Sequence, residues 1–218
     1  MANVTGVVLK ASTILVLVSL CGALVGCEAP LIGTEPGLAG TQRDDLQRSA
    51  SRPTIERDTS YETVVVERDF AIPLDQFSDW FAMTGAPRVA SFLTGTTTVP
   101  GVIRSEPLIG AWTKVGDRRR IVFSDGNSAL EEIVTNQLPK RFQYEMWNLT
   151  SRRGRYIRYA ISEFSLSGND GGTHVRWTYS FRPNAWPDGW FMSRYVHVDI
   201  RQFMELALTT MGKGSLPG

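Results

Sequence analysis

The sequence predicts an α+β domain in which consecutive strands form an antiparallel sheet and one long helix ends the domain. Strand-like runs follow one another closely. The short turn signals between them fit antiparallel neighbours, because parallel neighbours need a long crossover connection. After the last run, helical periodicity extends over about residues 188–211. Together these two patterns predict a sheet that is complete before the last helix begins.

The first predicted elements are one strand and two short helices. Val64–Ile72 is rich in β-branched residues, which favour strands, and Pro73 ends the run. In Leu74–Ala82 the aromatic side chains recur at helical spacing, and Arg88–Leu93 is expected to form a second short helix.

Six further strands are expected after a loop that contains Pro100 and Pro107. Residue pairs and triplets typical of turns, such as Asp-Gly-Asn and Pro-Lys, separate these strands. The expected strands are Ala111–Val115, Arg119–Phe123, Ala129–Gln137, Arg141–Asn148, Tyr156–Leu166 and Thr173–Arg182. With the first strand they bring the sheet to about seven strands.

The N-terminus has the pattern of a secretory signal. Lys10 precedes the apolar run Ala11–Ala23, which is shorter than the ~20 apolar residues that a membrane-spanning helix needs. The segment Leu24–Cys27 (LVGC) then resembles the lipobox of bacterial lipoproteins. This resemblance implies a diacylglyceryl group on the thiol of Cys27 and cleavage before Cys27, which frees its amine. At least two acyl chains then anchor the mature protein in a membrane. An uncleaved anchor or a plain secretory signal is the alternative.

The chain therefore divides into a signal peptide over 1–26, the lipidated Cys27 with a flexible tether over 27–60, and a domain over 61–218. The tether is rich in Gly, Pro, Ser, Thr and alternating charges, so it cannot bury enough apolar surface to offset the entropy of ordering it. We expect a monomer in the cell envelope that faces away from the cytoplasm, on the periplasmic side if the host is Gram-negative. The formal net charge of +1 gives no support for a nucleic-acid partner.

The order of the expected elements resembles the helix-grip fold of the START-like, polyketide cyclase and birch-pollen-allergen superfamily (SRPBCC). The segments that carry the resemblance are Val64–Ala82, Gly110–Gly126, Glu131–Val134, Leu138–Tyr144 and Gly172–Trp177. The resemblance implies a curved sheet wrapped around the last helix, with an elongated apolar cavity between them. A lipocalin-like barrel or another open α+β sheet is the alternative fold.

The last helix and two strands supply candidate ligand-binding residues. Apolar side chains of the helix fall within an arc of roughly 120°, and residues of the last strand alternate between apolar and polar. The candidates are Phe142, Tyr144, Trp177, Tyr179, Val196, Ile200, Phe203 and Met204. Such residues either line a pocket or simply fill the core.

Adjacent Glu131 and Glu132 lie in one predicted strand, so one of them should face the interior unless the strand bulges. A buried carboxylate needs a donor or stays protonated. Arg158, Arg176 and Tyr144 are candidate donors, and another donor is left open. The inward glutamate is either part of a structural ion pair or a ligand-reading or general-base group. Asp199 is a weaker catalytic candidate, with a solvated helix position as its alternative.

Other chemistry has little support in the sequence. His174 and His197 have no neighbouring Cys or His-Glu motif, so no metal is expected, and no motif for a nucleotide or other cofactor is present. The clusters Arg118–Arg120 and Arg152–Arg155 are expected at hairpin ends. They are either solvated edges or contacts for anionic lipid head groups.

Two main functions remain open at this point. The first is a membrane-tethered binder of a hydrophobic small molecule or lipid. The second is an enzyme of the polyketide cyclase/aromatase type, in which a pocket orients a reactive chain. A third alternative is an envelope interaction module with a filled core. A cavity with convergent polar groups favours the binder or the enzyme, whereas a closed core favours the module.

Overall fold

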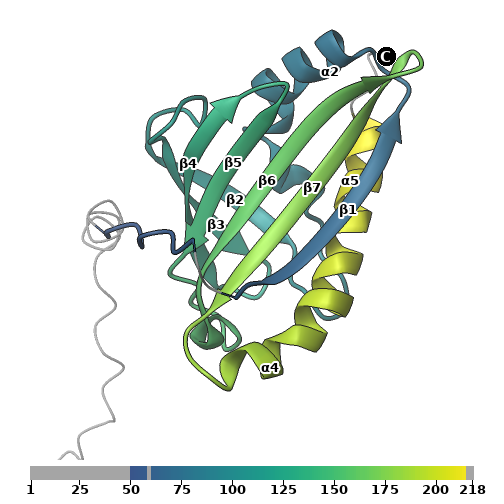
Figure 1. Ribbon diagram of the computed structural model, residues 1–218. Helices are drawn as coiled ribbons and strands as arrows, with labels where there is room; N and C mark the ends of the chain where they lie inside the picture. Colours follow the sequence, from purple (N-terminus) through teal and green to yellow (C-terminus); the bar gives the residue numbers. More distant parts are fainter. Residues whose placement is uncertain (1–49, 58–59, 215–218) are drawn as a thin grey trace, which may run out of the picture. The chain divides into compact units, whose positions relative to one another are not determined.

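The structure is a computed structural model that describes residues 50–57 and 60–214. Within those residues, seven strands form one antiparallel sheet in the order β1-β7-β6-β5-β4-β3-β2 (Figure 1). The strands are β1 (Glu62–Phe70), β2 (Val102–Ile109), β3 (Arg118–Phe123), β4 (Ser128–Gln137), β5 (Arg141–Trp147), β6 (Ile157–Asn169) and β7 (Gly172–Pro183). The predicted α+β class and antiparallel sheet are confirmed. The expected signal peptide and Cys27 lie outside the described residues.

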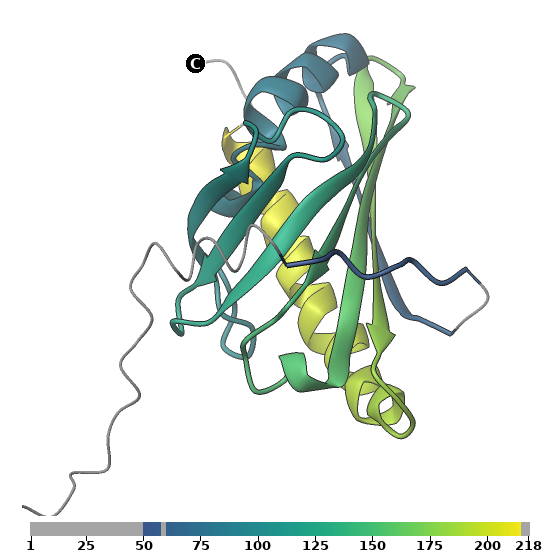
Figure 2. The same cartoon turned by 90° about the vertical axis from the view of Figure 1, so that its left-hand side faces the viewer.

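The described helices lie in three places: between β1 and β2, before β6 and after β7. After β1 come α2 (Leu74–Trp80), the π-helical turn η1 (Phe81–Gly85) and the short α3 (Val89–Phe92). The short η2 (Gly154–Tyr156) precedes β6. The predicted C-terminal helix consists of α4 (Asp188–Arg194), the π-helical stretch η3 (Tyr195–Ile200) and α5 (Arg201–Gly214), which follow one another without a break. Figures 1 and 2 show this helix running along one face of the sheet, with α2 and α4 near opposite ends.

One predicted strand is wrong and one strand was missed. Ala111–Val115 forms a loop, and the strand of this region is β2, which was expected to be part of a proline-containing loop. Pro107 is tolerated because β2 is an edge strand of the sheet. No strand pairs with its open side, so the N–H that proline lacks is not needed for hydrogen bonding there. The Asp117 carboxylate holds the loop by accepting hydrogen bonds from the backbone N–H groups of Thr113 at 2.8 Å and Lys114 at 3.2 Å.

The inner face of the sheet packs against the C-terminal helix. Along β7 the predicted alternation is confirmed, because Val175, Trp177, Tyr179 and Phe181 are buried and belong to the main core. α2 and η1 close one end of the core with Phe77 and Phe81. The helix contributes Met192, Val196, Ile200, Phe203, Met204, Ala207, Leu208 and Met211. Burial of these large side chains supplies the main stabilising free energy of the domain.

The outer face of the sheet carries a second, smaller apolar cluster. Its members are Leu108, Leu130, Trp147 and Tyr159. Residues 50–57, which the sequence places in the expected tether, run beside this cluster (Figure 2). The backbone N–H of Glu56 donates to the Tyr159 hydroxyl at 2.8 Å, and Arg118 Nη1 donates to the carbonyl of Ala50 at 2.7 Å. Glu56 also pairs with Arg158. This part of the expected tether therefore contacts the domain.

Glu145 is a fully buried carboxylate on the outer face of β5. Its Oε2 lies 3.6 Å from Arg52 Nε, and neither carboxylate oxygen has a hydrogen-bond partner among the described residues. Cross-strand Glu132 faces the same side of the sheet. Burial raises the pKa of Glu145 to about 7, Arg52 opposes this shift, and the negative charge of Glu132 adds to it.

The raised pKa of Glu145 predicts that stability falls as the pH rises. The ordinary pKa of a glutamate is 4.5, so the folded state holds the proton more tightly than the unfolded chain does. The contribution of protonated Glu145 to the free energy of unfolding is therefore fully present below about pH 4.5. It is lost as the pH rises through about 7. Glu145→Gln cannot ionise. We expect it to raise the free energy of unfolding at pH 8 by on the order of 1–3 kcal/mol and to leave it nearly unchanged at pH 4.

Urea unfolding at the two pH values measures this difference. Glu163→Gln is the matched control, because Glu163 is on the neighbouring strand and pairs with Arg141 at 2.7 Å. The control should change stability by a similar small amount at both pH values. An equal effect of Glu145→Gln at pH 4 and pH 8 would contradict the assignment.

Candidate functional site

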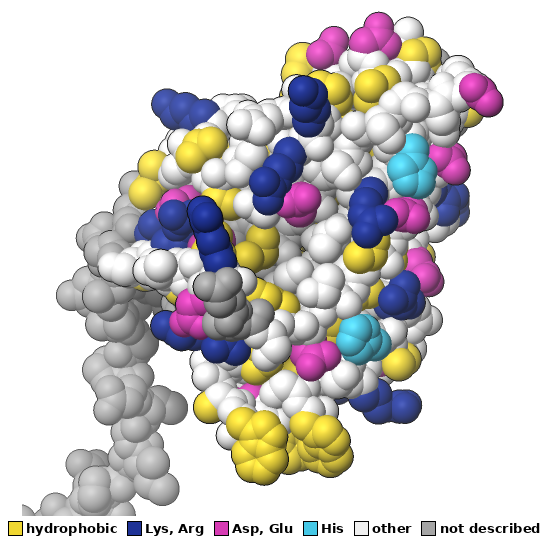
Figure 3. Space-filling view, in the orientation of Figure 1, with side chains coloured by type: hydrophobic (Ala, Val, Ile, Leu, Met, Phe, Trp, Pro, Cys, Tyr) yellow, Lys and Arg dark blue, Asp and Glu magenta, His cyan; other side chains and the backbone are white. Residues whose placement is uncertain are grey.

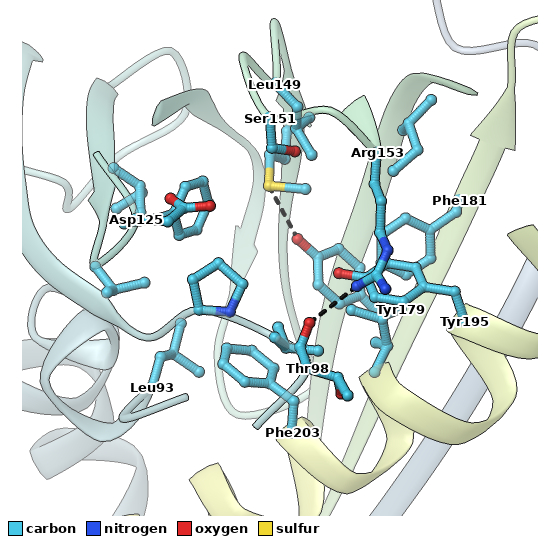
Figure 4. Close-up of a pocket in the computed structure, with 18 of the residues that line it drawn as sticks. Leu93, Thr98, Asp125, Leu149, Ser151, Arg153, Tyr179, Phe181, Tyr195 and Phe203 are labelled. Atoms are coloured by element: carbon cyan, nitrogen blue, oxygen red, sulfur yellow. Dashed lines mark hydrogen bonds between the residues drawn. The ribbon is translucent and has the colours of Figure 1, made fainter. Parts of the chain in front are cut away.

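A cavity of about 600 Å³ lies between the sheet and the C-terminal helix (Figure 4). Its walls come from the inner face of the sheet, from the last helix and from the loops at one end of the sheet. Side chains from β5 and β7 that line it are Tyr144, Met146, Trp177, Tyr179 and Phe181, and side chains from the helix include Ile200 and Phe203. Most of the lining is apolar, which suits a hydrophobic ligand.

Five of the eight predicted ligand-binding residues line the cavity: Tyr144, Trp177, Tyr179, Ile200 and Phe203. The other three are buried outside its wall. Phe142 packs edge-on against the Phe81 ring, with the centroids 5.8 Å apart, and Val196 and Met204 have no exposed surface. The apolar arc of the helix is wide, so one part of it packs against the sheet while the other part borders the cavity.

The residues that form the mouth of the cavity were not predicted from the sequence. They include Leu93, Val99, Leu149, Arg153, Tyr156 and Tyr195. Most of these residues lie in connections between strands, where no periodicity marks a side chain as inward. Tyr195 lies on the helix, where its polar hydroxyl does not mark it as part of the apolar arc.

Two polar groups inside the cavity wall are held by neighbouring side chains. The Tyr179 hydroxyl donates to Met146 Sδ at 3.2 Å, and Trp177 Nε1 donates to Ser162 Oγ at 2.8 Å. Burial raises the pKa of both Tyr144 and Tyr179 far above the usual value for a tyrosine. Both phenols therefore stay protonated at any physiological pH. The Tyr144 hydroxyl can donate a hydrogen bond to a ligand, whereas the single hydrogen of Tyr179 is directed at Met146 Sδ and its oxygen can accept.

Glu131 faces the cavity and forms a buried ion pair with Arg119. Arg119 Nε donates to Glu131 Oε2 at 2.7 Å, and both side chains are almost fully buried. The predicted inward glutamate is thus Glu131, and its partner is Arg119 rather than one of the candidate donors. Arg158 pairs with Glu56, and Arg176 pairs with Glu67.

Arg119 also contacts two other parts of the domain. Its guanidinium lies 3.8 Å from the ring centroid of Trp112, and its Nη1 donates to the carbonyls of Ala86 and Pro87 at 3.3 and 3.2 Å. The backbone φ of Trp112 is 62°, which lies in the left-handed region that residues other than glycine rarely adopt. Burial raises the pKa of Glu131, whereas the positive charge and hydrogen bond of Arg119 act to lower it.

The other catalytic candidates do not line the cavity. Glu132 points to the outer face, where Arg118 Nη2 donates to its Oε2 at 2.6 Å. Asp199 accepts a hydrogen bond from the Thr98 hydroxyl at 2.8 Å, so it ties the helix to the loop before β2. Of the three carboxylates singled out in the sequence, Glu131 alone is part of the cavity wall among the described residues.

A bridge of polar contacts crosses the mouth of the cavity (Figure 4). Arg153 Nη1 donates to the carbonyl of Thr98 at 2.9 Å, and the guanidinium lies 4.3 Å from the ring centroid of Tyr195. Asp125, Arg152 and Arg153 are exposed and also line the cavity at this end. The cavity thus reaches the surface between the loop before β2, the β5–β6 connection and the helix.

The first basic cluster is not at a hairpin end, contrary to expectation. Arg118, Arg119 and Arg120 lie within β3, and each pairs with a glutamate. Their partners are Glu132, Glu131 and Glu106. The cluster therefore fastens β3 to its neighbouring strands. The second cluster, Arg152–Arg155, does lie in the β5–β6 connection.

Over the described ranges, no group of His, Cys, Asp and Glu side chains is arranged to hold a metal ion. In the same part of the chain, no helix is long and apolar enough to cross a membrane.

Solved structures of similar architecture identify the fold. Truncated norcoclaurine synthase from Thalictrum flavum has a TM-score of 0.56 at 13% identity, with 76% of this chain and 99% of that chain covered. Ara h 8.0201 has a TM-score of 0.55 at 14% identity, with 72% and 98% covered. A protein from Thermus thermophilus has a TM-score of 0.52 at 15% identity, with 70% and 96% covered.

At these identities the likeness shows the fold alone. The chain has the helix-grip fold, as the resemblance in its sequence implied, and the lipocalin-like alternative is excluded. No protein-family model matches the chain, and no curated protein matches it either.

The buried pair predicts strong coupling between Arg119 and Glu131. Glu131→Leu leaves a guanidinium without its counter-charge in the core, so it should lower the free energy of unfolding by ~3–5 kcal/mol. Arg119→Met should cost a similar amount. The double variant removes both charges, so it should cost clearly less than the sum of the two single variants.

Urea unfolding of the two single variants and the double variant gives the coupling energy. Arg120→Met with Glu106→Leu is the matched control, because this pair joins the same strand to β2 and is more exposed. Its coupling should not exceed ~1 kcal/mol. If the losses of unfolding free energy in the Arg119 and Glu131 single variants add up to the loss in the double variant, the two charges do not stabilise each other.

Proposed function

We propose that the domain binds a hydrophobic small molecule or lipid in the cavity between the sheet and the helix. The observation that carries this proposal is the cavity itself, which is about 600 Å³ in volume and has a mostly apolar wall. Its volume lies in the range of ligand pockets in proteins. A domain that only had to be stable would fill this space, because empty volume in a core costs free energy.

The polar groups of the wall would orient such a ligand. The phenols of Tyr144 and Tyr179 are protonated, Tyr144 can donate and Tyr179 can accept a hydrogen bond, and Glu131 is a carboxylate beside them. These groups are few and lie toward the inner face of the sheet, so an apolar body with a polar end fits the cavity better than a wholly apolar molecule does. The interaction module with a filled core is less well supported, because the core is not closed.

An enzyme of the polyketide cyclase/aromatase type is the second candidate. It is favoured by one observation, the carboxylate of Glu131 in a cavity wall that also contains Tyr144 and Tyr179. In that case Glu131 would move a proton and a phenol would stabilise a developing enolate oxygen. The ion pair with Arg119 weakens this alternative, since it holds the carboxylate in a structural role.

The membrane tether is part of the proposal. A lipidated Cys27 would hold the chain in a membrane, and the segment up to residue 60 would connect it to the domain. The support for this step is the sequence pattern of Leu24–Cys27 behind an apolar run. A ligand with low solubility in water would then be taken up from, or delivered to, that membrane.

Displacement of a fluorescent fatty acid tests the binding proposal. Phe203→Ala changes a residue that lines the cavity, and Met204→Ala changes its neighbour, which is fully buried outside the cavity wall. We expect Phe203→Ala to weaken or strengthen probe binding severalfold and to cost less than the ~3–5 kcal/mol of a core phenylalanine.

Met204→Ala is expected to cost ~2–5 kcal/mol of stability and to leave probe affinity nearly unchanged. The two readouts are the probe dissociation constant and the free energy of unfolding. Two results together would contradict the proposal: the wild-type protein takes up no apolar probe, and Phe203→Ala lowers the free energy of unfolding by the full amount expected for a core phenylalanine. The cavity would then not be a binding site, and the interaction module with a filled core would replace the proposal.

Metabolic labelling with a fatty-acid analogue tests the tether. The wild-type chain should be labelled and should partition with membranes, whereas Cys27→Ala should be unlabelled, because the acylated thiol is gone. Cys21→Ala is the matched control, since it removes the other cysteine of the signal region and should keep the label. Equal labelling of wild type and Cys27→Ala would rule out lipidation at this residue.

A further inference from the structure

Three large aromatic side chains are exposed at one end of the molecule. Trp186 is 91% exposed, Trp190 is 74% exposed and Phe191 is 54% exposed. They lie in the connection between β7 and α4 and in α4 itself. Figure 3 shows large hydrophobic side chains gathered at the end of the molecule where Figure 1 places α4. Tryptophan is seldom so exposed in a monomer unless the surface meets another apolar phase.

This aromatic patch, Trp186 with Trp190 and Phe191, continues into the mouth of the cavity. The Phe191 ring is 4.9 Å from the Trp190 ring and 6.1 Å from the Tyr156 ring, measured between centroids. Tyr156 lines the cavity. Tyr195, which follows Phe191 by one helical turn, also lines it. The exposed aromatic surface and the cavity therefore share a border.

Arginines surround the same border. Arg152, Arg153 and Arg155 in the β5–β6 connection and Arg194 in α4 are all exposed. The guanidinium of Arg155 lies 4.6 Å from the Tyr156 ring centroid, and Arg153 stacks on Tyr195. The nearby acidic residues are Asp188 at the start of α4, Asp125 at the cavity mouth, Asp199 on the helix and Glu62 beside α4. Asp199 accepts a hydrogen bond from Thr98 and Glu62 pairs with His197, so the exposed arginines of the β5–β6 connection carry the positive charge beside the cavity mouth.

We propose that this end of the domain docks on a lipid bilayer that contains anionic lipids. Trp186, Trp190 and Phe191 enter the interfacial region, where amphipathic aromatic rings are favoured, and the arginines contact the phosphate and other anionic head groups. The mouth of the cavity then faces the bilayer. A protein partner would also cover an aromatic patch, but the border of arginines and the continuity with an apolar cavity favour lipid.

This docking does not depend on acylation of Cys27, and it goes beyond the proposed function because it assigns a surface rather than a ligand. Each docked arginine near an anionic surface adds a favourable electrostatic contribution, which salt weakens. The surface would act together with any anchor on the chain, since a tethered domain meets the bilayer at high effective concentration.

Quenching of tryptophan emission by brominated lipids tests the docking. The full chain is reconstituted into phosphatidylcholine vesicles with bromines on the acyl chains, with and without phosphatidylglycerol. We expect marked quenching with phosphatidylglycerol and little without it. Trp186→Ser/Trp190→Ser should remove the quenched component, because the other tryptophans of the described chain lie elsewhere in the fold.

Charge reversal tests docking without removing the two tryptophans whose emission reports it. Arg155→Glu/Arg194→Glu keeps both exposed tryptophans and should lower the quenched fraction by at least about twofold on anionic vesicles. Arg88→Glu, an exposed arginine outside the patch, and Met83→Ser, which is 74% exposed near the other end of the sheet, should leave it unchanged.

Absence of quenching on anionic vesicles, or equal quenching in the charge-reversed and control variants, would overturn the docking proposal. In the first case the patch would be left to a protein partner. Displacement of the fatty-acid probe in solution is measured on the same variants and should be unaffected by Arg155→Glu/Arg194→Glu. If the wild-type protein takes up no probe while its tryptophan emission is quenched on anionic vesicles, the cavity proposal fails and the docking proposal stands.

Discussion

The buried contact between Arg119 and Glu131 is the constraint on which the site end of the structure depends. A charged pair inside a core is costly unless its hydrogen-bonding groups find partners, so the surrounding elements must hold it in one geometry. Glu131 comes from β4 and Arg119 from β3, while Trp112 and the carbonyls of Ala86 and Pro87 contact the guanidinium, whose Nη2 is buried with no hydrogen-bond partner among the described residues. The pair therefore joins two strands, the loop between β2 and β3, and the connection before α3.

The same contact decides what kind of wall the cavity has. It supplies one carboxylate to a mostly apolar surface and keeps that carboxylate close to a positive charge. The phenols of Tyr144 and Tyr179 lie in the same wall and stay protonated. This arrangement is suited to holding the polar end of an apolar molecule, since the hydrogen-bonding groups are fixed before a ligand arrives.

Local patterns in the sequence predicted most of the fold because the fold depends on simple periodicities. Alternation along 172–183 identified the inward side chains of β7, and helical spacing identified the last helix. The strand that was not predicted is β2. Pro107 favours a loop by local propensity, but β2 lies at the open edge of the sheet, and the position of a strand within a sheet is not visible in its own residues.

The site was predicted less completely, since it depends on contacts between distant residues. Opposite orientation of Glu131 and Glu132 follows from strand geometry, but the choice of Arg119 as partner follows from the register of β3 against β4. Burial of Glu145 was not predicted, because it requires the packing of Arg52 and the outer cluster around it. The mouth of the cavity is likewise built from loops that meet only in the folded chain.

Native mass spectrometry of the full chain, purified gently from the membranes of its own host, shows whether the cavity holds a ligand. We expect a population that carries an additional, non-covalent mass of a hydrophobic small molecule or lipid, which organic solvent removes and which is separate from any acyl group on Cys27. A folded protein that carries no mass beyond the polypeptide and its covalent groups, in every such preparation, would contradict the claim that the cavity is a ligand-binding site.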